Sequence, residues 1–275
     1  MKGFLTALCA VLLLLPFDLD ARKKSVQPEI PSQWNGRKVA YLGDSITDKD
    51  QVEAGVNDTY WVFLKDILGI EPLVYGINGH QSNQIIGQAE RLLADYGQDF
   101  DAIMVFVGTN DFNASLPMGE WFMVNPEKTT VDGPVEVTRL HREFNFDPDT
   151  FKGRVNSMML YLKTTFPEKQ LILLTPIHRA YACFGPGNIQ PDESFANAEG
   201  LFIDDYVTAI KELANIWSVP VVDLNSECGL MPTLDQHHQY FRGNDGNDYL
   251  HPNTKGHRRM AYALAYQLLH YPTAF

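Results

Sequence analysis

The chain has 275 residues and a formal net charge of -12, with 45% hydrophobic and 20% charged residues. This composition is ordinary for a globular protein and excludes both a largely disordered chain and a bundle of membrane helices. Phosphate backbones are held by clustered Lys and Arg, so an acidic chain predicts no nucleic-acid partner. The length suits one sizeable α/β domain with a buried core.

The N-terminus has the pattern of an export signal, because basic Lys2 is followed by an apolar run over residues 4–17 and a polar segment over residues 18–24. This apolar run is shorter than the ~20 residues that span a bilayer, so we expect no stable membrane insertion of the mature chain. We predict a signal peptide over residues 1–25 and a single domain over residues 26–275.

The predicted location is periplasmic or extracellular. A lipoprotein is the less favoured alternative, because Leu8 precedes Cys9 where a lipid-attachment site has a small residue. The mature chain then holds Cys183 and Cys228 in an oxidising compartment, where a disulfide persists. Sequence does not define the Cα separation that a bridge requires, so a disulfide and two separate thiols both remain open.

Short apolar runs alternate with longer segments of helical periodicity, which is typical of βαβ units and a parallel sheet. Strands are predicted over residues 38–42, 72–75, 102–107, 170–174 and 219–223. Helices are predicted to begin near Thr59, Ser82 and Asp147, and two further helices carry residues 202–217 and 260–268. The predicted fold is a flavodoxin-like three-layer α/β/α domain with a five-stranded parallel sheet.

An excursion over residues 112–147 interrupts this alternation after the third strand. It is longer than an ordinary connection between elements. Asp132-Gly133 lies between alternating runs and predicts a β-hairpin, although Pro134 weakens this pattern. Asp147-Pro148 then predicts the start of the next helix, with a carboxylate at the cap and Pro at the first helical position.

Polar groups follow several of the predicted strands and therefore meet at one edge of the sheet. Ser45 follows the first strand, and an alcohol nucleophile needs an adjacent base, usually a His held by a carboxylate. Asp248 and His251, three residues apart, can supply both groups from one loop. Candidate donors to an oxyanion are the N–H groups of Ser45 and Gly79 and the side-chain amide of Asn110.

These residues resemble the motif blocks of the SGNH (GDSL-type) esterases and acylhydrolases. The blocks are Gly43-Asp44-Ser45-Ile46-Thr47, Gly79, Gly108-Thr109-Asn110-Asp111 and the D-x-x-H-P motif from Asp248 to Pro252. The resemblance spans about residues 38–270. It implies that Ser45 is the nucleophile, that Gly79 and Asn110 complete an oxyanion hole, and that His251 is the base oriented by Asp248. It implies no cofactor and no metal.

Several residues have a simpler interpretation. Ser45 can cap a helix, and Asp44 is favoured as a turn residue over a second catalytic acid. Gly76 competes with Gly79 as the oxyanion glycine. His178 also follows a strand and is the rival base, although a structural role is favoured because no carboxylate stands at a comparable spacing.

Trp121 and Phe122 of the excursion, beside Asn110, are candidate substrate contacts, and so is His178. The alternative for the two aromatic residues is that they form the core of a small subdomain. The predicted function is a secreted serine esterase that removes a small acyl group, most plausibly acetyl, from a carbohydrate. The alternatives are a lipase, lysophospholipase or thioesterase, a metal-dependent phosphohydrolase that uses Asp44 and Asp111 among its ligands, and a non-catalytic glycan-binding module. The particular ester and the oligomeric state stay open.

Overall fold

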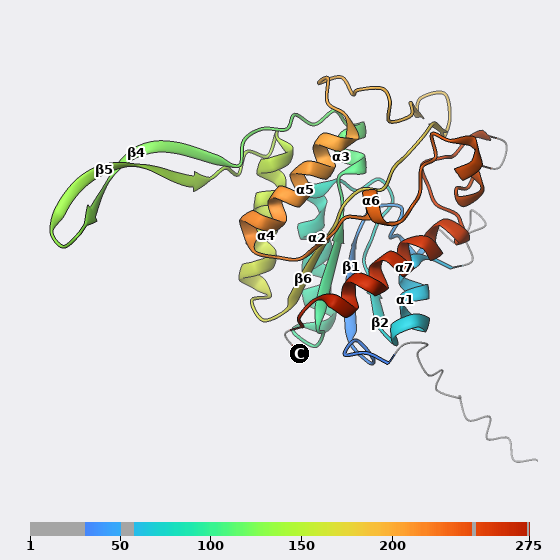
Figure 1. Cartoon of the computed structure of the whole chain (residues 1–275), viewed down its shortest axis with the longest axis horizontal. Coiled ribbons are helices and arrows are strands. Elements are labelled where there is room, and N and C mark those ends of the chain that lie inside the picture. Colours follow the sequence, from blue (N-terminus) through green and yellow to red (C-terminus); the bar gives the residue numbers. More distant parts are fainter. Residues whose placement is uncertain (1–30, 51–57, 244–245, 274) are drawn as a thin grey trace, which may run out of the picture.

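A five-stranded parallel sheet forms the centre of the molecule (Figure 1). The computed structural model describes residues 31–50, 58–243, 246–273 and 275, so the signal peptide predicted over residues 1–25 lies outside the described residues. The strand order is β2 (Glu71–Val74), β1 (Lys38–Gly43), β3 (Ala102–Phe106), β6 (Gln170–Leu174) and β9 (Val221–Val222). All neighbours pair in parallel, which confirms the predicted flavodoxin-like α/β fold.

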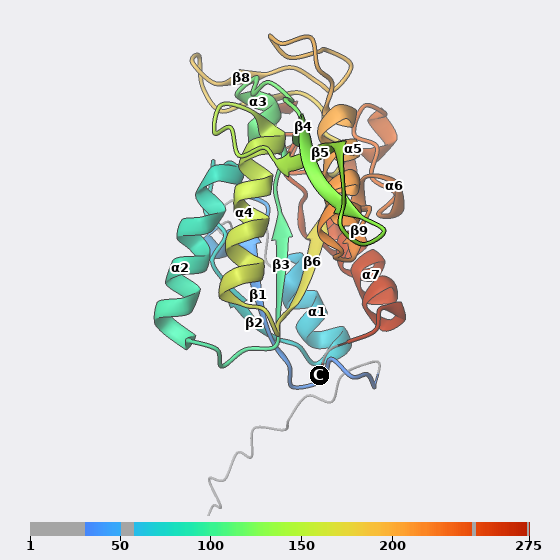
Figure 2. The same ribbon diagram turned by 90° about the vertical axis from the view of Figure 1, so that its left-hand side faces the viewer.

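Helices cover both faces of this sheet (Figure 2). One face carries α2 (Ile85–Tyr96), α4 (Phe151–Thr165) and α5 (Ile203–Trp217). The other face carries α1 (Tyr60–Leu68) and α7 (Thr254–His270). This arrangement follows from βαβ connectivity, in which each crossover helix packs back onto the sheet.

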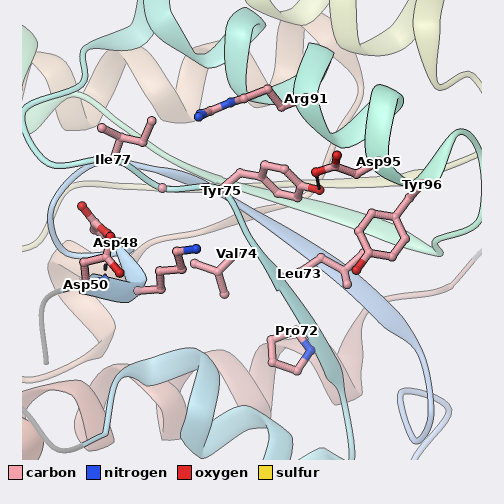
Figure 3. A pocket seen from close by; sticks show the side chains of 12 residues that line it. Asp48, Asp50, Pro72, Leu73, Val74, Tyr75, Ile77, Arg91, Asp95 and Tyr96 are labelled. Atoms are coloured by element: carbon pink, nitrogen blue, oxygen red, sulfur yellow. Dashed lines mark hydrogen bonds between the residues drawn. The ribbon is translucent and has the colours of Figure 1, made fainter.

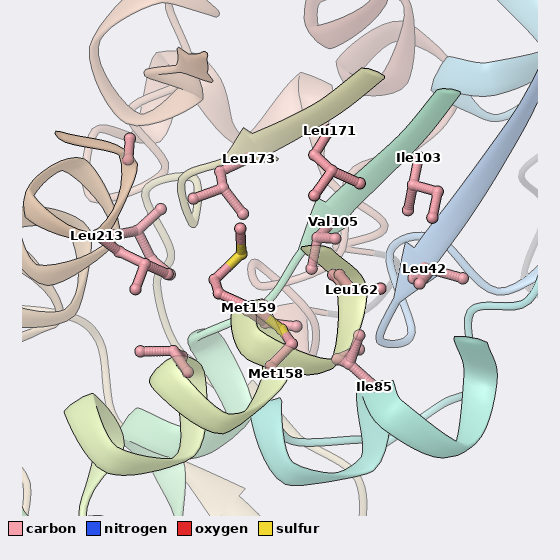
Figure 4. Close-up of a cluster of buried hydrophobic side chains, with 14 of the residues drawn as sticks. Leu42, Ile85, Ile103, Val105, Met158, Met159, Leu162, Leu171, Leu173 and Leu213 are labelled. Carbon is pink, nitrogen blue, oxygen red and sulfur yellow. The ribbon is translucent and has the colours of Figure 1, made fainter. Parts of the chain in front are cut away.

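Two hydrophobic clusters fill the layers between helices and sheet, because successive strand residues point to opposite faces. In β3, Ile103 and Val105 pack toward α2 and α4, whereas Met104 and Phe106 belong to the cluster on the other face. Figure 4 shows part of the first cluster, in which leucines of the strands meet Met158 and other residues of the helices. Because β1, β3 and β6 are buried on both faces, their sequences are continuous apolar runs.

The carboxyl ends of the strands lead into short elements that form the rim of the sheet. These are η2 (Ser82–Gln84), α3 (Thr109–Asn113), β7 (Ala182–Cys183), β8 (Ile189–Gln190), α6 (Leu224–Glu227) and η3 (Asp235–Tyr240). The strand order reverses direction at β1, and a crevice for ligands opens at such a switch point. The loop that follows β1 therefore lies where α/β proteins of this type bind their ligands.

The excursion after the third strand is a long β-hairpin that projects away from the domain (Figure 1). Its strands are β4 (Phe122–Val131) and β5 (Val135–Phe144), which pair along their full length. Asp132 and Gly133 have φ values of 46° and 90°, so the Asp-Gly turn predicted from the sequence is confirmed. The hairpin is several residues longer on each side than the alternating runs suggested.

Three boundaries differ from the predictions. Helix α4 begins at Phe151 rather than at Asp147-Pro148, because the Thr150 side chain accepts the Gly153 N–H and caps the helix there. The short helix α3 follows β3 directly, where we expected no helix. Strand β9 is confined to Val221–Val222, since Pro220 has no N–H to extend the ladder.

Cys183 and Cys228 are free thiols. Of the two possibilities left open by the sequence, the structure therefore shows two separate thiols. Cys228 is buried beside α7 and Cys183 is half-buried in β7. In the part of the chain that is described, every helix is too short or too polar to cross a lipid bilayer.

Candidate active site

The turn that carries Ser45 is held by a set of buried hydrogen bonds. Gln88 of α2 accepts the Gly43 N–H and donates to the Gly43 carbonyl, both at 2.8 Å, and so pins the end of β1. The Asp44 carboxylate accepts the Ile46 N–H at 2.9 Å, and the main-chain carbonyl of Asp44 accepts the N–H of Thr47. Asp44 thus acts as the turn residue that the sequence favoured, and Ser45 stands at the tip of a rigid turn.

Ser45, His251 and Asp248 form one hydrogen-bonded series. The His251 Nε2 lies 2.8 Å from the Ser45 Oγ, and the His251 Nδ1 lies 2.9 Å from the Asp248 Oδ2. The Asp248 Oδ1 also accepts the N–H groups of Leu250 and His251, which fixes the carboxylate. With Nδ1–H donating to the carboxylate, Nε2 has a lone pair for the serine proton, as general-base catalysis requires.

Electrostatics keep this pair in the form that a base needs. Burial lowers the pKa of His251 below its usual value, and the Asp248 carboxylate opposes this only in part. The charges of Arg242 and Arg179 lower the His251 pKa further. Burial alone raises the pKa of Asp248, but its hydrogen bonds with His251 hold the net pKa below the usual value. At neutral pH the imidazole is therefore neutral and the carboxylate is ionised.

Gly79 has the conformation and surroundings expected of a main-chain donor to an oxyanion. Its φ is +77°, and a Cβ built there meets no atom within 4 Å, so the space beside it is open. The rival glycine, Gly76, is instead buried, and a Cβ there lies 2.7 Å from Thr47. Across the described residues, the N–H groups of Ser45 and Gly79 donate to no acceptor.

Hydrogen bonds also tie the three candidate donor loops to one another. Asp48, three residues after Ser45, accepts the Asn78 N–H at 2.8 Å. The Asn110 side-chain amide donates to the His80 carbonyl at 3.0 Å, which leaves its second N–H available for a ligand. The structure therefore brings together the turn after β1, the turn around Gly79 and the first turn of α3, as an oxyanion hole requires.

Asp111 is buried and braces the first turn of α3. Its carboxylate accepts the Ser82 hydroxyl at 2.6 Å and the Ser82 N–H, while Arg154 lies 4.0 Å away. These bonds attach α3 to η2, the short helix that precedes α2. Among the described residues, no group of three or more His, Cys, Asp or Glu side chains is arranged to hold a metal ion.

The segment after β6 is a part of the site that sequence reasoning missed. Ala180 donates to the Tyr249 carbonyl and Tyr249 donates to Tyr181, both at 3.0 Å, so this segment forms a short antiparallel ladder with the loop that carries Asp248. Phe184 follows this ladder and sets its ring edge-on against His251, with centroids 5.3 Å apart. Only the Gly/Pro content of this loop was visible in sequence, and that predicts no contact.

His178 is not brought to the serine. Its Nδ1 lies 2.7 Å from Glu193, which also accepts the Arg179 N–H, and this hydrogen bond raises the pKa of His178. The sequence analysis found no carboxylate at a suitable spacing from His178. The carboxylate that pairs with it, Glu193, lies fifteen residues further along the chain. His178 braces the loop after β6.

Trp121 and Phe122 lie at the root of the hairpin, and no described contact brings either ring to the triad. Trp121 is only 8% exposed and donates to Glu212 of α5 at 2.7 Å. Phe122 packs against Phe144, whose ring stacks on Trp217 at 4.4 Å. This packing agrees with the alternative prediction, in which these aromatic residues form a small core.

A doubly wound parallel sheet with serine, histidine and carboxylate in contact at its carboxyl edge defines an α/β protein built like a serine hydrolase. The family model of the GDSL-like lipases and acylhydrolases matches residues 41–259. The chain therefore belongs to the GDSL-like lipase/acylhydrolase family and is a hydrolase of ester bonds. No curated protein matches the sequence.

Solved structures share the fold. A protein from Lactobacillus plantarum has 24% identity and a TM-score of 0.64, with 85% of this chain and 97% of that chain covered. A possible lipase from Chitinophaga pinensis has 21% identity and a TM-score of 0.62, with coverages of 84% and 97%. A mutant acetylxylan esterase from Geobacillus stearothermophilus has 18% identity and a TM-score of 0.51, with coverages of 87% and 96%.

Proposed function

We propose that this protein is an exported serine esterase that removes a small acyl group, acetyl in the first instance, from a carbohydrate. The observation that carries the proposal is the unbroken series from the Ser45 Oγ through His251 to Asp248, with contacts of 2.8 and 2.9 Å. Such a series is what activates an alcohol nucleophile at neutral pH.

The proposed reaction proceeds in two halves. The Ser45 Oγ attacks the ester carbonyl carbon and its proton passes to the His251 Nε2, while Asp248 stabilises the imidazolium. The N–H groups of Ser45 and Gly79 and the Asn110 amide receive the negative oxygen of the tetrahedral intermediate. The tetrahedral intermediate then collapses with cleavage of its C–O bond to the sugar, and His251 gives its proton to the departing sugar oxygen, which leaves as a hydroxyl and leaves the acyl group on Ser45. Water, deprotonated by His251, releases the acyl group from Ser45 and restores the enzyme.

The preference for a small acyl group rests on Phe184. Its ring lies against His251, and it is held there by the ladder between the segment after β6 and the loop of Asp248. A bulky ring at this place narrows the space beside the base, which favours acetyl over the long chains of a lipid or thioester substrate. The carbohydrate assignment is supported by the acetylxylan esterase that shares the fold. Export rests on the N-terminal sequence pattern.

The test is hydrolysis of 4-nitrophenyl esters from acetyl to dodecanoyl. Ser45→Ala should lower kcat on the acetate by roughly 10⁶-fold, as loss of a serine nucleophile does. Ser226→Ala is the matched control, because this serine is exposed in α6 and its loss should leave activity unchanged. Activity of Ser45→Ala near wild type would refute the triad, and a wild-type preference for dodecanoate would select the lipase alternative.

A further inference from the structure

We infer that the groove along β2, which is an edge strand of the sheet in the described part of the chain, binds the carbohydrate chain that carries the ester. This inference rests on the proposed function and extends it, because it places the sugar units beyond the reacting one. The groove is a cavity of about 880 Å³ between β2 and α2 (Figure 3). It lies outside the triad, and no residue of the reaction described above lines it.

The lining of the groove includes residues next to the turns of the proposed oxyanion hole. These residues are Asp48 and Ile77. Asp48 closes the turn of Ser45 and bonds the Asn78 N–H, and Ile77 precedes Asn78 and Gly79 in the chain. A chain whose ester reaches Ser45 can therefore extend past these residues and lie along β2.

The side chains in the groove suit a polyhydroxyl ligand. The Tyr75 hydroxyl donates to Asp95 at 2.7 Å, which fixes the ring and leaves the second carboxylate oxygen to accept from a sugar hydroxyl. Arg91 lies one turn before Asp95 on α2, and Tyr96 is 39% exposed beside them. Amphipathic aromatic rings next to planar hydrogen-bonding groups match the alternating apolar and hydroxyl surfaces of a sugar ring.

Charge and the strand edge favour an uncharged glycan over a peptide. Lys49 and Arg91 nearly balance the carboxylates of the groove, so it selects neither a strong anion nor a strong cation. An edge strand can pair with a peptide through its outward N–H and C=O groups. Here Glu71 and Tyr75 donate inward to β1, so Pro72 stands at an outward position and offers no donor.

The experiment measures how much kcat/KM rises when the acetylated substrate is a tetrasaccharide instead of a monosaccharide. Chemically acetylated tetrasaccharides of xylose, glucose, mannose and N-acetylglucosamine are compared with the corresponding acetylated monosaccharides, using wild type, Tyr96→Ala and Arg91→Ala. Both positions are exposed on α2, where Ala supports the helix. Tyr266→Ala, on α7 across the sheet and 69% exposed, is the control with the same substitution.

For at least one sugar, the wild type should show a kcat/KM about tenfold higher on the tetrasaccharide than on the monosaccharide, which corresponds to one good additional contact. Tyr96→Ala and Arg91→Ala should remove most of this gain through KM, and Tyr266→Ala should keep it. Turnover of sugar acetates with no gain from chain length in the wild type would overturn the groove and leave the proposed function standing. A gain retained in both groove variants would also overturn it. Failure of the wild type to hydrolyse any acetate would overturn the proposed function itself.

Discussion

The rim of the sheet and the β4–β5 hairpin are held together by opposite means. At the rim, buried polar groups find partners far away in the chain, as Ser45 does with His251 and Ser82 does with Asp111. In the hairpin the ion pairs join the two strands to each other, as in Lys128 with Glu136 at 2.6 Å. The rim therefore exists only when the whole sheet has formed, whereas the hairpin depends on its own turn and register.

The difference extends to burial and anchoring. The hairpin is exposed along most of its length, and Leu140 is 76% exposed. It is fastened at its root, where buried Asn156 donates to the carbonyls of Trp121 and Asn145 and accepts from the Trp217 indole. Substitutions at the rim should therefore change catalysis strongly, and changes to the outer hairpin should change little.

After Ser45→Ala, the largest effect in the rim is expected from Asp248→Asn. The amide keeps the shape of the side chain but cannot accept the Nδ1–H of His251 in the same way, so the imidazole loses its tautomer and its counter-charge. We expect kcat on 4-nitrophenyl acetate to fall by about 10⁴-fold, as it does for other triads. Asp235→Asn, at a side chain that is 95% exposed, is the control. A loss below tenfold would show that His251 does not depend on Asp248.

Asn110→Ala should have the next largest effect. It removes the side-chain donor of the proposed oxyanion hole, which costs about 10² to 10³ in kcat when the donor acts on the transition state. Because the ground-state ester is bound mainly by other groups, KM should change far less. Asn215→Ala, at an exposed position of α5, is the control. An equal rise of KM with an unchanged kcat would assign Asn110 to substrate binding only.

Asp44→Asn tests the rigid turn beneath the nucleophile through the pH dependence of stability. Burial raises the pKa of Asp44 to about 7, against the Ile46 N–H that lowers it. The unfolded chain ionises this group near its ordinary value, so its contribution to stability is present at low pH and is lost as the pH rises toward 7.

Asn at this position can still accept the Ile46 N–H and carries no charge to bury. Relative to wild type, the free energy of unfolding of Asp44→Asn should therefore rise between pH 4 and pH 7, by about 1 to 4 kcal/mol, and level off above pH 7. Urea unfolding at a series of pH values measures it. Parallel curves for the two proteins would show that Asp44 is ionised in the folded state.

The sequence was sufficient for the features set by local pattern. Apolar runs located all five strands of the sheet, and Asp132-Gly133 marked the hairpin turn. The motif blocks also selected Ser45 and His251, 206 positions apart, which the structure places in contact. Their order along a βαβ pattern was the signal, because strand ends of a parallel sheet share one edge.

What the sequence could not supply were partners chosen by tertiary packing. Gln88 looks like an ordinary polar helix residue, yet it is buried and bonds both main-chain groups of Gly43. Glu193 serves His178 across a loop with no periodicity. Trp121 belongs to the excursion and lies near Asn110 in sequence, but its ring packs into the hydrophobic core beside α5. Such contacts depend on how irregular loops fold back, for which no residue spacing is diagnostic.

The smallest effect is expected from shortening the hairpin. Removal of residues 125–141, with Asn-Gly joining the cross-strand partners Val124 and Arg142, keeps the whole root, including the Arg142 guanidinium over the Phe122 ring. Since the removed part pairs only with itself, kcat/KM on the acetate should stay within about twofold and the free energy of unfolding within roughly 0.5 kcal/mol.

The matched change at the root is Asn156→Ala, which leaves buried carbonyls without donors and should cost about 2 kcal/mol or more. Thermal and urea unfolding measure the free energy of unfolding of the two variants, and their kcat/KM on the acetate is measured alongside. If the shortened protein lost activity more than tenfold while keeping its stability, the outer hairpin would have to contact the substrate. The substrate contacts that the sequence predicted at Trp121 and Phe122 would then lie further out, on the exposed strands themselves.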